Sequence, residues 1–331
     1  MMKKIIPPVS LDLIEKELTE DKFLRETNVG HNSIFIVTAH DSPNVMREIG
    51  RLREITFRQA GGGTGKEMDI DEYDTAEIPF KQLIVWNNEN KEIVSSYRFI
   101  CGKDVPLDEN GYPHTPTSKL FYFSKKFIEG KWLKTIELGR SFVQPKYQGT
   151  TNPRQGLFSL DNLWDGLGTL AVDYPDVSFF LGKMTMYNSY NRLARNLILF
   201  FLRKYFKGDK NLIAPYNPIS GDRRKQVFHS IFRNGSYKED FRVLNENVRD
   251  LKTSIPPLIK SYMSLSSKMK CFGASANPEF GPVEEIAIMI KIADINEDKK
   301  RRYIYSYKKK ERGRGEKLKR ARIKWKTIET A

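Results

Sequence analysis

The chain has little of several residues and motifs that would assign it to well-known functional classes. Its 331 residues include only two cysteines, Cys101 and Cys271, which are far apart and belong to no Cys-x-x-Cys pair. This scarcity indicates a reducing compartment and argues against a structural zinc site. The four histidines form no cluster with metal-ligand spacing, so we expect no metal centre.

Long hydrophobic runs are also absent. The longest run, LILFFL at residues 197–202, is far shorter than the roughly 20 apolar residues that cross a membrane. The apolar stretch near the N-terminus is interrupted by Pro7 and Pro8 and is too short for a secretory signal. We therefore predict a cytoplasmic protein.

The motifs of several catalytic classes are incomplete. GGGTGK at residues 61–66 resembles a phosphate-binding loop, but Ala60 and Glu67 stand where that loop needs Gly and Ser or Thr. No Gly-x-Ser-x-Gly hydrolase elbow occurs. His31 and His40 lack the aspartate that a His-x4-Asp acyltransferase motif requires. We therefore predict a flexible glycine-rich loop at 61–66 and neither of these catalytic mechanisms.

What the chain has in excess is positive charge, and most of it lies at one end. The net charge is +15, and residues 299–331, with 15 Lys and Arg against three Glu, account for +12. Such a tail can bind any polyanion, including nucleic acid, anionic lipid or an acidic protein, or it can lack a specific partner. Its aromatic residues would suit single-stranded nucleic acid, but the rest of the chain shows no nucleic-acid module. We therefore disfavour nucleic acid as a partner.

Hydrophobic periodicity predicts alternating helices and strands. The expected strands are 33–39, a hairpin over 82–100, 134–143, 177–187 and 283–295, and the expected helices are 42–58, 160–174 and 191–206. This order predicts an α/β fold with a mixed central sheet flanked by helices.

Several polar or aromatic residues occupy positions where a plain core residue would fold as well. Buried polar groups are costly unless they are paired or take part in chemistry. Each one alone could be an ordinary ion pair or core contact, but their joint spacing indicates a site. In chain order they are Arg53, Phe57, Asp71, Asp74, Arg98, Glu137 and Arg140.

This set resembles, in order and spacing, the signature of the acyl-homoserine-lactone synthases, which are GNAT-fold enzymes. Two further segments, ELGRSFVQPKY at 137–147 and SIPPLIKSYMSLSSKMKCFGASANPEFG at 254–281, are similar to the ornithine-lipid N-acyltransferases. That hemolysin-like family includes relatives that acylate glycine. The resemblance implies an N-terminal extension over 1–40, a GNAT-like acyltransferase domain over 41–298 and a basic tail over 299–331.

The resemblance also implies a reaction. An acyl chain, expected to be 3-hydroxylated, would move from acyl carrier protein to the α-amine of glycine or ornithine and give a lyso-aminolipid. The donor would be the acyl-phosphopantetheine of the carrier protein, with no tightly bound cofactor. Gly149 and Gly156 lack the spacing of the GNAT pyrophosphate loop, which favours a carrier-protein arm over free CoA. The alternatives are a GNAT that acylates another amine from acyl-CoA, and a non-catalytic GNAT-like protein that binds polyanions through its tail.

The residues receive roles from this resemblance. Glu137 is the expected general base, acting directly or through water, or else an ion-pair partner that holds the fold. Arg140 would organise a charged network above the acyl site, or would hold a substrate carboxylate. Phe57 is expected to line the donor cleft or to pack in the core. The other network members are Arg53, Asp71, Asp74 and Arg98.

Two kinds of partner surface are expected. An acidic carrier protein would be steered by Lys and Arg side chains, and the candidates are Lys146, Arg154, Lys183, Arg192 and Arg195. Each basic residue of the tail 299–331 would contribute about 1 kcal/mol to binding at an anionic membrane surface. We therefore expect peripheral association with the inner face of the membrane.

Overall fold

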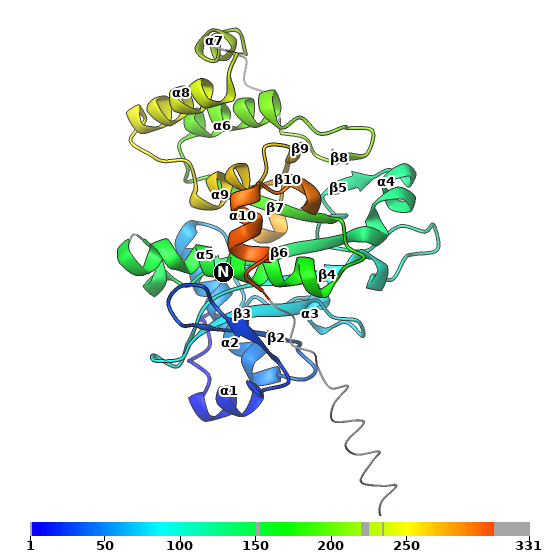
Figure 1. The fold of residues 1–331 in the computed structure, drawn as a ribbon, viewed down its shortest axis with the longest axis vertical. Coiled ribbons are helices and arrows are strands. Elements are labelled where there is room, and N and C mark those ends of the chain that lie inside the picture. Colours follow the sequence, from blue (N-terminus) through cyan, green and yellow to red (C-terminus); the bar gives the residue numbers. More distant parts are fainter. Residues whose placement is uncertain (1, 150–152, 220–224, 234, 308–331) are drawn as a thin grey trace, which may run out of the picture.

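The computed structural model describes residues 2–149, 153–219, 225–233 and 235–307 (Figure 1). Its strands are β1 Phe23–Glu26, β2 Ser33–Val37, β3 Lys81–Asn87, β4 Glu92–Cys101, β5 Phe121–Phe123, β6 Thr135–Val143, β7 Phe179–Tyr187, β8 Ile213–Pro215, β9 Lys270–Ala276 and β10 Val283–Lys291. Its helices are α1 Leu11–Glu17, α2 Pro43–Ala60, α3 Glu72–Thr75, α4 Lys125–Gly130, α5 Pro153–Asp173, α6 Arg192–Tyr205, α7 Lys225–Ile231, α8 Tyr237–Asp250, α9 Pro257–Leu265 and α10 Glu297–Lys299.

One large mixed sheet organises the molecule. Its eight strands run in the order β1-β2-β3-β4-β6-β7-β10-β9, and β5 and β8 form a separate pair. Among the described strands, β6 and β7 are the one parallel pair in a sheet that is otherwise antiparallel. This confirms the predicted α/β class. Because β2 pairs with β3, residues 23–37 contribute to the same sheet, although the sequence analysis began the acyltransferase domain at residue 41.

Helices cover both faces of this sheet. On one face, α5, α6 and α9 pack over an apolar core that includes Leu138, Trp164 and Tyr262. On the other face, α2 buries a stripe formed by Val45, Ile49 and Leu52. The three- and four-residue spacing of that stripe is the helical period that predicted α2.

Some elements were missed because their apolar pattern is weak. Helix α8 buries only Asp240, Leu244 and Val248, and Asp240 is satisfied from outside the helix by Lys204 Nζ at 2.6 Å. Phe241, Leu244 and Val248 still recur at the helical period, but the helix is polar overall, so its few apolar residues are easily overlooked in the sequence.

The glycine-rich loop after α2 is held by a carboxylate of the same chain. Glu54, buried in α2, accepts hydrogen bonds from Thr64 N and Oγ1 at 3.1 and 2.7 Å and from Gly65 N at 2.7 Å. These amide groups already have an anionic partner. The loop is therefore more ordered than the sequence analysis predicted.

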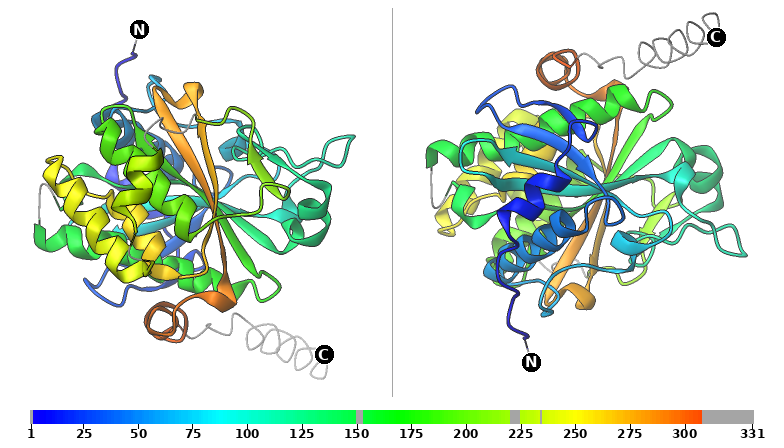
Figure 2. Two further views of the ribbon diagram at one scale, coloured as in Figure 1. Left: turned by 90° about the horizontal axis from the view of Figure 1, so that it is seen from above. Right: turned by 90° about the horizontal axis from the view of Figure 1, so that it is seen from below.

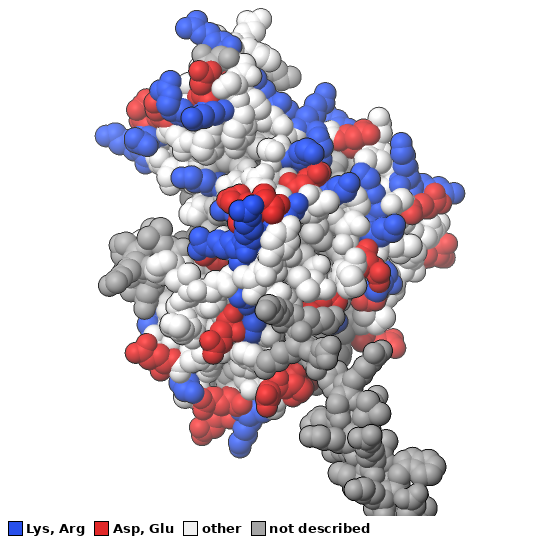
Figure 3. Space-filling model, viewed as in Figure 1, with Lys and Arg blue, Asp and Glu red and all other residues white. Residues whose placement is uncertain are grey.

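The two ends of the long axis differ in composition. Helices α7 and α8 lie at one end and α1 at the other (Figure 1), and Figure 2 shows these two ends from above and from below. Lys and Arg gather at the α7–α8 end and Asp and Glu at the α1 end (Figure 3). Within the described residues, no helix combines the length and the apolar content needed to cross a bilayer.

The first residues of the predicted basic tail are packed against the body. Tyr303 is buried, and its hydroxyl donates to Asp161 Oδ1 on α5 at 2.5 Å. A Cβ on Gly168 would lie 2.0 Å from the Tyr303 carbonyl oxygen, so this glycine allows the close approach. The helical segment through residue 307 therefore belongs to the body, and the rest of the tail, 308–331, lies outside the described residues.

Candidate active site

The parallel strands β6 and β7 separate in the middle of the sheet. Their register runs only from Thr135↔Phe179 to Glu137↔Leu181, although β6 continues to Val143 and β7 to Tyr187. Beyond Glu137 the facing backbone edges of the two strands do not pair with each other. Backbone N–H groups on such an edge can bind a developing oxyanion.

A β-bulge lies on β6 at the opening. Arg98↔Gly139 and Ser96↔Phe142 are paired, so Arg140 and Ser141 together lie opposite one residue of β4. Arg140 has a φ of +50°, a left-handed conformation that is strained for a side chain other than glycine. The extra residue moves the following side chains to the other face. Phe142 therefore joins the α2 face instead of the core that contains Leu138.

The opening forms a narrow cleft between the sheet, α5 and α9. Trp164 of α5 and Tyr262 of α9 lie in edge-to-face contact across it, with ring centroids 5.0 Å apart. The remaining cavity is about 40 Å³, room for a few water molecules at most. The residues that line it are Tyr97, Leu138, Gly139, Arg140, Ser141, Leu160, Leu163, Trp164, Leu167, Lys183, Leu258 and Tyr262.

Beside this cleft, on the α2 side, the structure brings together most of the predicted residues in one arginine–aspartate cluster. Its members are Arg53, Arg98, Arg140, Asp69, Asp71 and Asp74. Arg98 donates two hydrogen bonds to Asp71, at 2.6 and 2.8 Å, and its Nη1 lies 3.0 Å from Asp74. Arg53 Nη1 donates to Asp74 at 3.0 Å, and Arg140 Nε lies 2.8 Å from Asp69 Oδ2.

Local structure fixes the carboxylates of this cluster. Asp71 caps α3 by accepting from Tyr73 N, and Asp74 Oδ2 accepts from the Asp71 amide in a reciprocal capping box. Gln82 on β3 joins the cluster, accepting from Arg53 at 2.6 Å and donating to Asp74 at 3.0 Å. The cluster therefore ties α2, the α3 loop and the sheet to one another.

The cluster is electrically balanced. Burial alone would raise the pKa of Asp71, but the charges of Arg98, Arg140 and Arg53 and the hydrogen bonds from Arg98 hold that pKa well below its usual range. Burial opposes ionisation of Arg98 too, yet Asp74 and Asp71 raise its pKa above the ordinary value. Asp71 and Arg98 are therefore charged at neutral pH.

Glu137 lies on the same face of the sheet but outside this cluster. It is 1% exposed, and its Oε1 accepts from Thr117 N at 3.1 Å and from Thr117 Oγ1 at 2.6 Å. Within the described residues, its Oε2 has no hydrogen-bond partner. A buried carboxylate oxygen without a partner is costly, and it is a natural place for a proton acceptor or a water molecule.

Lys183 connects Glu137 with the cleft. Its Nζ donates to Thr117 Oγ1 at 2.9 Å, so Lys183, Thr117 and Glu137 form a continuous chain, which we call the proton chain. Lys183 lines the cleft whereas Glu137 does not. Burial lowers the pKa of Lys183, and nearby Glu137 and Glu285 offset only part of that effect. A lysine with a lowered pKa can exchange protons more readily near neutral pH.

The remaining predicted residue packs away from the cleft. Phe57 on α2 is buried against Phe280 and Phe142, with ring centroids 4.9 and 6.3 Å away, and it does not line the cavity. The guanidinium carbon of Arg140 lies 4.2 Å from the centre of the Phe280 ring. Phe57 therefore supports the platform beneath Arg140, and this contact is core packing.

The sequence analysis missed several residues that the structure places here. Asp69 precedes Asp71 by two positions in the same acidic loop, so its spacing could have revealed it. Thr117 lies in a long connection without a recognisable motif and reaches Glu137 only through the fold. Lys183 was named as a candidate for carrier-protein docking, but its contact with Thr117 places it inside the molecule.

The other docking candidates have different environments. Lys146 pairs with Glu92 at 2.5 Å and Arg195 with Glu284 at 2.7 Å. The side chain of Arg154 lies outside the described residues. Leu258 and Tyr262, from the 254–281 segment singled out by resemblance, do line the cleft, and Asn277 of that segment donates to Glu285 at 3.4 Å.

The chain is similar to several known proteins. A family model described as an acetyltransferase (GNAT) domain matches residues 52–155. The "Glycine N(alpha)-acyltransferase" of Bacteroides thetaiotaomicron is 52% identical over 303 residues, which cover 92% of this chain and 90% of that protein. The protein of the same name from Phocaeicola vulgatus is 52% identical over 305 residues, covering 92% and 94%. The solved structure of FeeM, an N-acyl amino acid synthase from uncultured soil microbes, covers 80% of this chain and 94% of its own, with 11% identity and a TM-score of 0.40.

Proposed function

Because the chain belongs to the glycine N(alpha)-acyltransferase family, we propose that it transfers an acyl chain from a thioester to the α-amine of glycine. The observation that carries this proposal is the proton chain Lys183–Thr117–Glu137, which ends in the cleft between β6 and β7. Amide formation needs a deprotonated amine, a polarised carbonyl and a fixed approach. The cleft offers a residue or backbone edge for each.

The amine would be activated through the proton chain. Lys183 in its neutral form takes a proton from the ammonium group of glycine, and Thr117 passes a proton on to Glu137. The amine nitrogen then attacks the thioester carbonyl carbon and loses a further proton to the sulfur, so that the carbon–sulfur bond breaks and a thiol leaves. Glu137 therefore receives the amine proton through Lys183 and Thr117 and does not contact the amine itself.

The separated edges of β6 and β7 would stabilise the reaction's charged intermediate. The thioester oxygen gains negative charge when the nitrogen attacks, and backbone N–H groups beyond Glu137 and Leu181 face the space where it would lie. Gly182, at the start of the opening, leaves room there, because a Cβ would lie 3.6 Å from the Leu138 carbonyl oxygen. Trp164 and Tyr262 have to move apart before an acyl chain can enter.

The proposed donor is an acyl carrier protein, and the proposed product is a lyso-aminolipid. The narrow, mainly apolar cleft suits a pantetheine arm and its acyl chain more than a free nucleotide-bearing thioester. The basic residues at the α7–α8 end (Figure 3) would supply the charge that an acidic carrier protein needs. A lipid product would also suit the proposed contact of the tail with an anionic membrane surface.

The test is a defined reaction with purified protein. Hexadecanoyl and 3-hydroxyhexadecanoyl groups are presented on carrier protein and on CoA, each with glycine, ornithine or no acceptor, and the products are measured by mass spectrometry. We expect N-acylglycine from the carrier-protein donors at the highest kcat/KM. Faster turnover with acyl-CoA would contradict the donor, preference for ornithine would contradict the acceptor, and no acylated amino acid from any pair would contradict the function.

The membrane proposal needs a separate variant. Residues 299–307 pack against α5, so deletion should begin at residue 308. We expect the shortened protein to keep turnover of soluble substrates and to lose sedimentation with anionic liposomes. Unchanged sedimentation would exclude the tail as the membrane-binding segment.

A further inference from the structure

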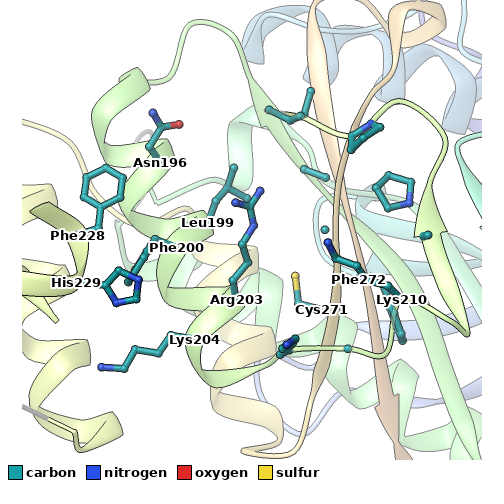
Figure 4. Close-up of a pocket in the computed structure, with 18 residues that line it drawn as sticks. Asn196, Leu199, Phe200, Arg203, Lys204, Lys210, Phe228, His229, Cys271 and Phe272 are labelled. Atoms are coloured by element: carbon teal, nitrogen blue, oxygen red, sulfur yellow. The ribbon is translucent and has the colours of Figure 1, made fainter. Parts of the chain in front are cut away.

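A second cavity, much larger than the cleft, lies between α6, α7 and the strands β8 and β9 (Figure 4). Its volume is about 750 Å³, within the range of small-molecule binding sites. Among the described residues, none lines both this cavity and the β6–β7 cleft. We call it the α6–β9 groove.

The walls of the groove are mainly apolar. Leu199 and Phe200 of α6 face it from one side, Phe228 of α7 from a second, and Phe272 of β9 from a third (Figure 4). Leu199, Phe228 and Phe272 are themselves largely buried, so the groove is a cavity with apolar walls, and a cavity of this kind binds an apolar group. The shape therefore indicates a ligand with a hydrocarbon portion.

The edge of the groove is cationic. Lys204 is matched by Asp240, but Arg203, Lys207 and Lys210 are exposed, and no described carboxylate lies within ion-pair distance of them. Among the described residues, no Asp or Glu lines the groove. Residues 192–270 contain 17 Lys and Arg and six Asp and Glu, a net charge of +11. A ligand in this position would therefore carry an anionic end.

We propose that the α6–β9 groove binds a single acyl chain that ends in a carboxylate. The hydrocarbon would lie against Leu199, Phe228 and Phe272, and the carboxylate would lie near Arg203, Lys207 and Lys210. The site would hold its ligand without chemistry, because it is separate from the proton chain. It is independent of the reaction proposed for the cleft.

The test measures binding to the full-length protein by equilibrium dialysis, with palmitate, laurate and hexadecylamine as probes. We expect palmitate to bind more tightly than laurate, by up to about fourfold for each added buried methylene, and hexadecylamine to bind at least tenfold more weakly than palmitate. The triple variant Arg203→Gln/Lys207→Gln/Lys210→Gln should lose at least tenfold in palmitate affinity. Equal affinity for palmitate and hexadecylamine would overturn the proposal.

A matched control separates this site from general attraction to a basic surface. Lys238→Gln/Arg242→Gln/Arg249→Gln removes the same charge from exposed positions on α8 that do not line the groove, and it should leave palmitate affinity within twofold of the wild type. An equal loss in both triple variants would show a diffuse electrostatic effect and overturn the proposal.

Two further arms identify the place and the source of the ligand. Gly182→Leu narrows the β6–β7 cleft and should leave palmitate binding unchanged. Loss of binding in this variant would show that palmitate binds in the cleft and not in the α6–β9 groove. N-palmitoylglycine should bind at least as tightly as palmitate if the natural ligand is an N-acyl amino acid, whereas a preference for palmitate would indicate a free fatty acid; both results support the site. Binding to anionic vesicles or to carrier protein, but to neither free ligand, would overturn the proposal.

Discussion

The arginine–aspartate cluster and the α6–β9 groove use positive charge in opposite ways. In the cluster, Arg53 and Arg98 are buried and aligned with aspartates from a separate loop. In the groove, Arg203 and Lys207 are exposed and the described residues offer them no carboxylate. Matched buried charges hold elements together, whereas unmatched charges at the edge of an apolar cavity are available to a ligand.

The proton chain is an intermediate case, which explains why chemistry is expected there. Lys183 has two carboxylates in its neighbourhood, but its direct contact is the hydroxyl of Thr117. Its charge is therefore less firmly fixed than that of Arg98, whose pKa the aspartates raise. A group that performs proton transfer needs this freedom, and a structural ion pair does not.

The largest expected effect is on turnover, through the proton chain. Glu137→Gln and Lys183→Met should each lower kcat by about 10²- to 10⁴-fold, because each removes a group that accepts the amine proton. The matched control is Glu285→Gln. Glu285 is a buried carboxylate near Lys183 that is not part of the proton chain, so this variant should lower kcat by less than tenfold. Steady-state kinetics would contradict the assignment if Glu137→Gln and Glu285→Gln were equally active.

The next effect is on stability, through the cluster. Arg98→Met should lower the free energy of unfolding by about 3–5 kcal/mol, because it leaves the half-buried Asp71 without its main partner and the buried Asp74 with Arg53 as its remaining arginine. Arg242→Met breaks an exposed pair with Glu246 and should cost at most about 1 kcal/mol. Urea unfolding of both variants measures the difference, and equal losses would show that the cluster is not structural.

A third effect is on the pH dependence of the free energy of unfolding, which has opposite signs for Asp165 and Asp71. Burial raises the pKa of Asp165 to about 6, although hydrogen bonds from Asn28 and the charge of Arg25 oppose the rise. The folded state then holds a proton between about pH 4 and pH 6 that the unfolded state releases, so stability falls as pH rises through this window. The contribution is at most about 3 kcal/mol.

The contribution of Asp71 to stability depends on pH with the opposite sign, because the folded state lowers the pKa of Asp71. This stabilisation is present at neutral pH and is lost only as the pH falls below about 4. Unfolding curves of Asp165→Asn against the wild type isolate the first window. We expect the stability of the variant to change less than that of the wild type between pH 4 and 6. Parallel pH profiles would show that Asp165 is ionised in both states.

The smallest expected effect is in the groove. The triple variant Arg203→Gln/Lys207→Gln/Lys210→Gln removes three charges at the edge of the groove. We expect it to change the free energy of unfolding by no more than about 0.5 kcal/mol for each residue. These side chains are exposed and unmatched, so the fold does not depend on them. A loss of several kcal/mol in thermal or urea unfolding would place them with the cluster instead of with a ligand site.

The sequence predicted the parts of this account that follow from local spacing. The alternation of β3, β4 and β6 and the helical stripe of α2 indicated the sheet and its cover. The intervals between Arg53, Asp71, Asp74 and Arg98 indicated a charged network, which the structure brings together. The strand and helix patterns each lie within one element, whereas the interval from Arg53 to Arg98 spans several elements and indicated a network through the family resemblance.

The parts that could not be predicted depend on contacts between distant segments. The hydrogen bond from Thr117 to Glu137 joins residues 20 positions apart, and the hydrogen bond from Lys183 to Thr117 joins residues 66 positions apart. No local sequence pattern marks either pair. Lys183 looked like a surface charge because a single lysine in a strand usually faces solvent. The left-handed Arg140 was hidden too, because nothing in the sequence marks a bulge at a residue other than glycine.

Thr117 provides the most direct test of the central claim that Lys183, Thr117 and Glu137 act as one chain in acyl transfer to an amino acid. Thr117→Val removes the hydroxyl with little change in shape, whereas Thr117→Ser keeps it. We predict that kcat for N-acylglycine formation falls by at least about 10²-fold in the valine variant and stays within a few-fold of the wild type in the serine variant, at KM values close to the wild type. A valine variant that turns over as fast as the serine variant would contradict the account.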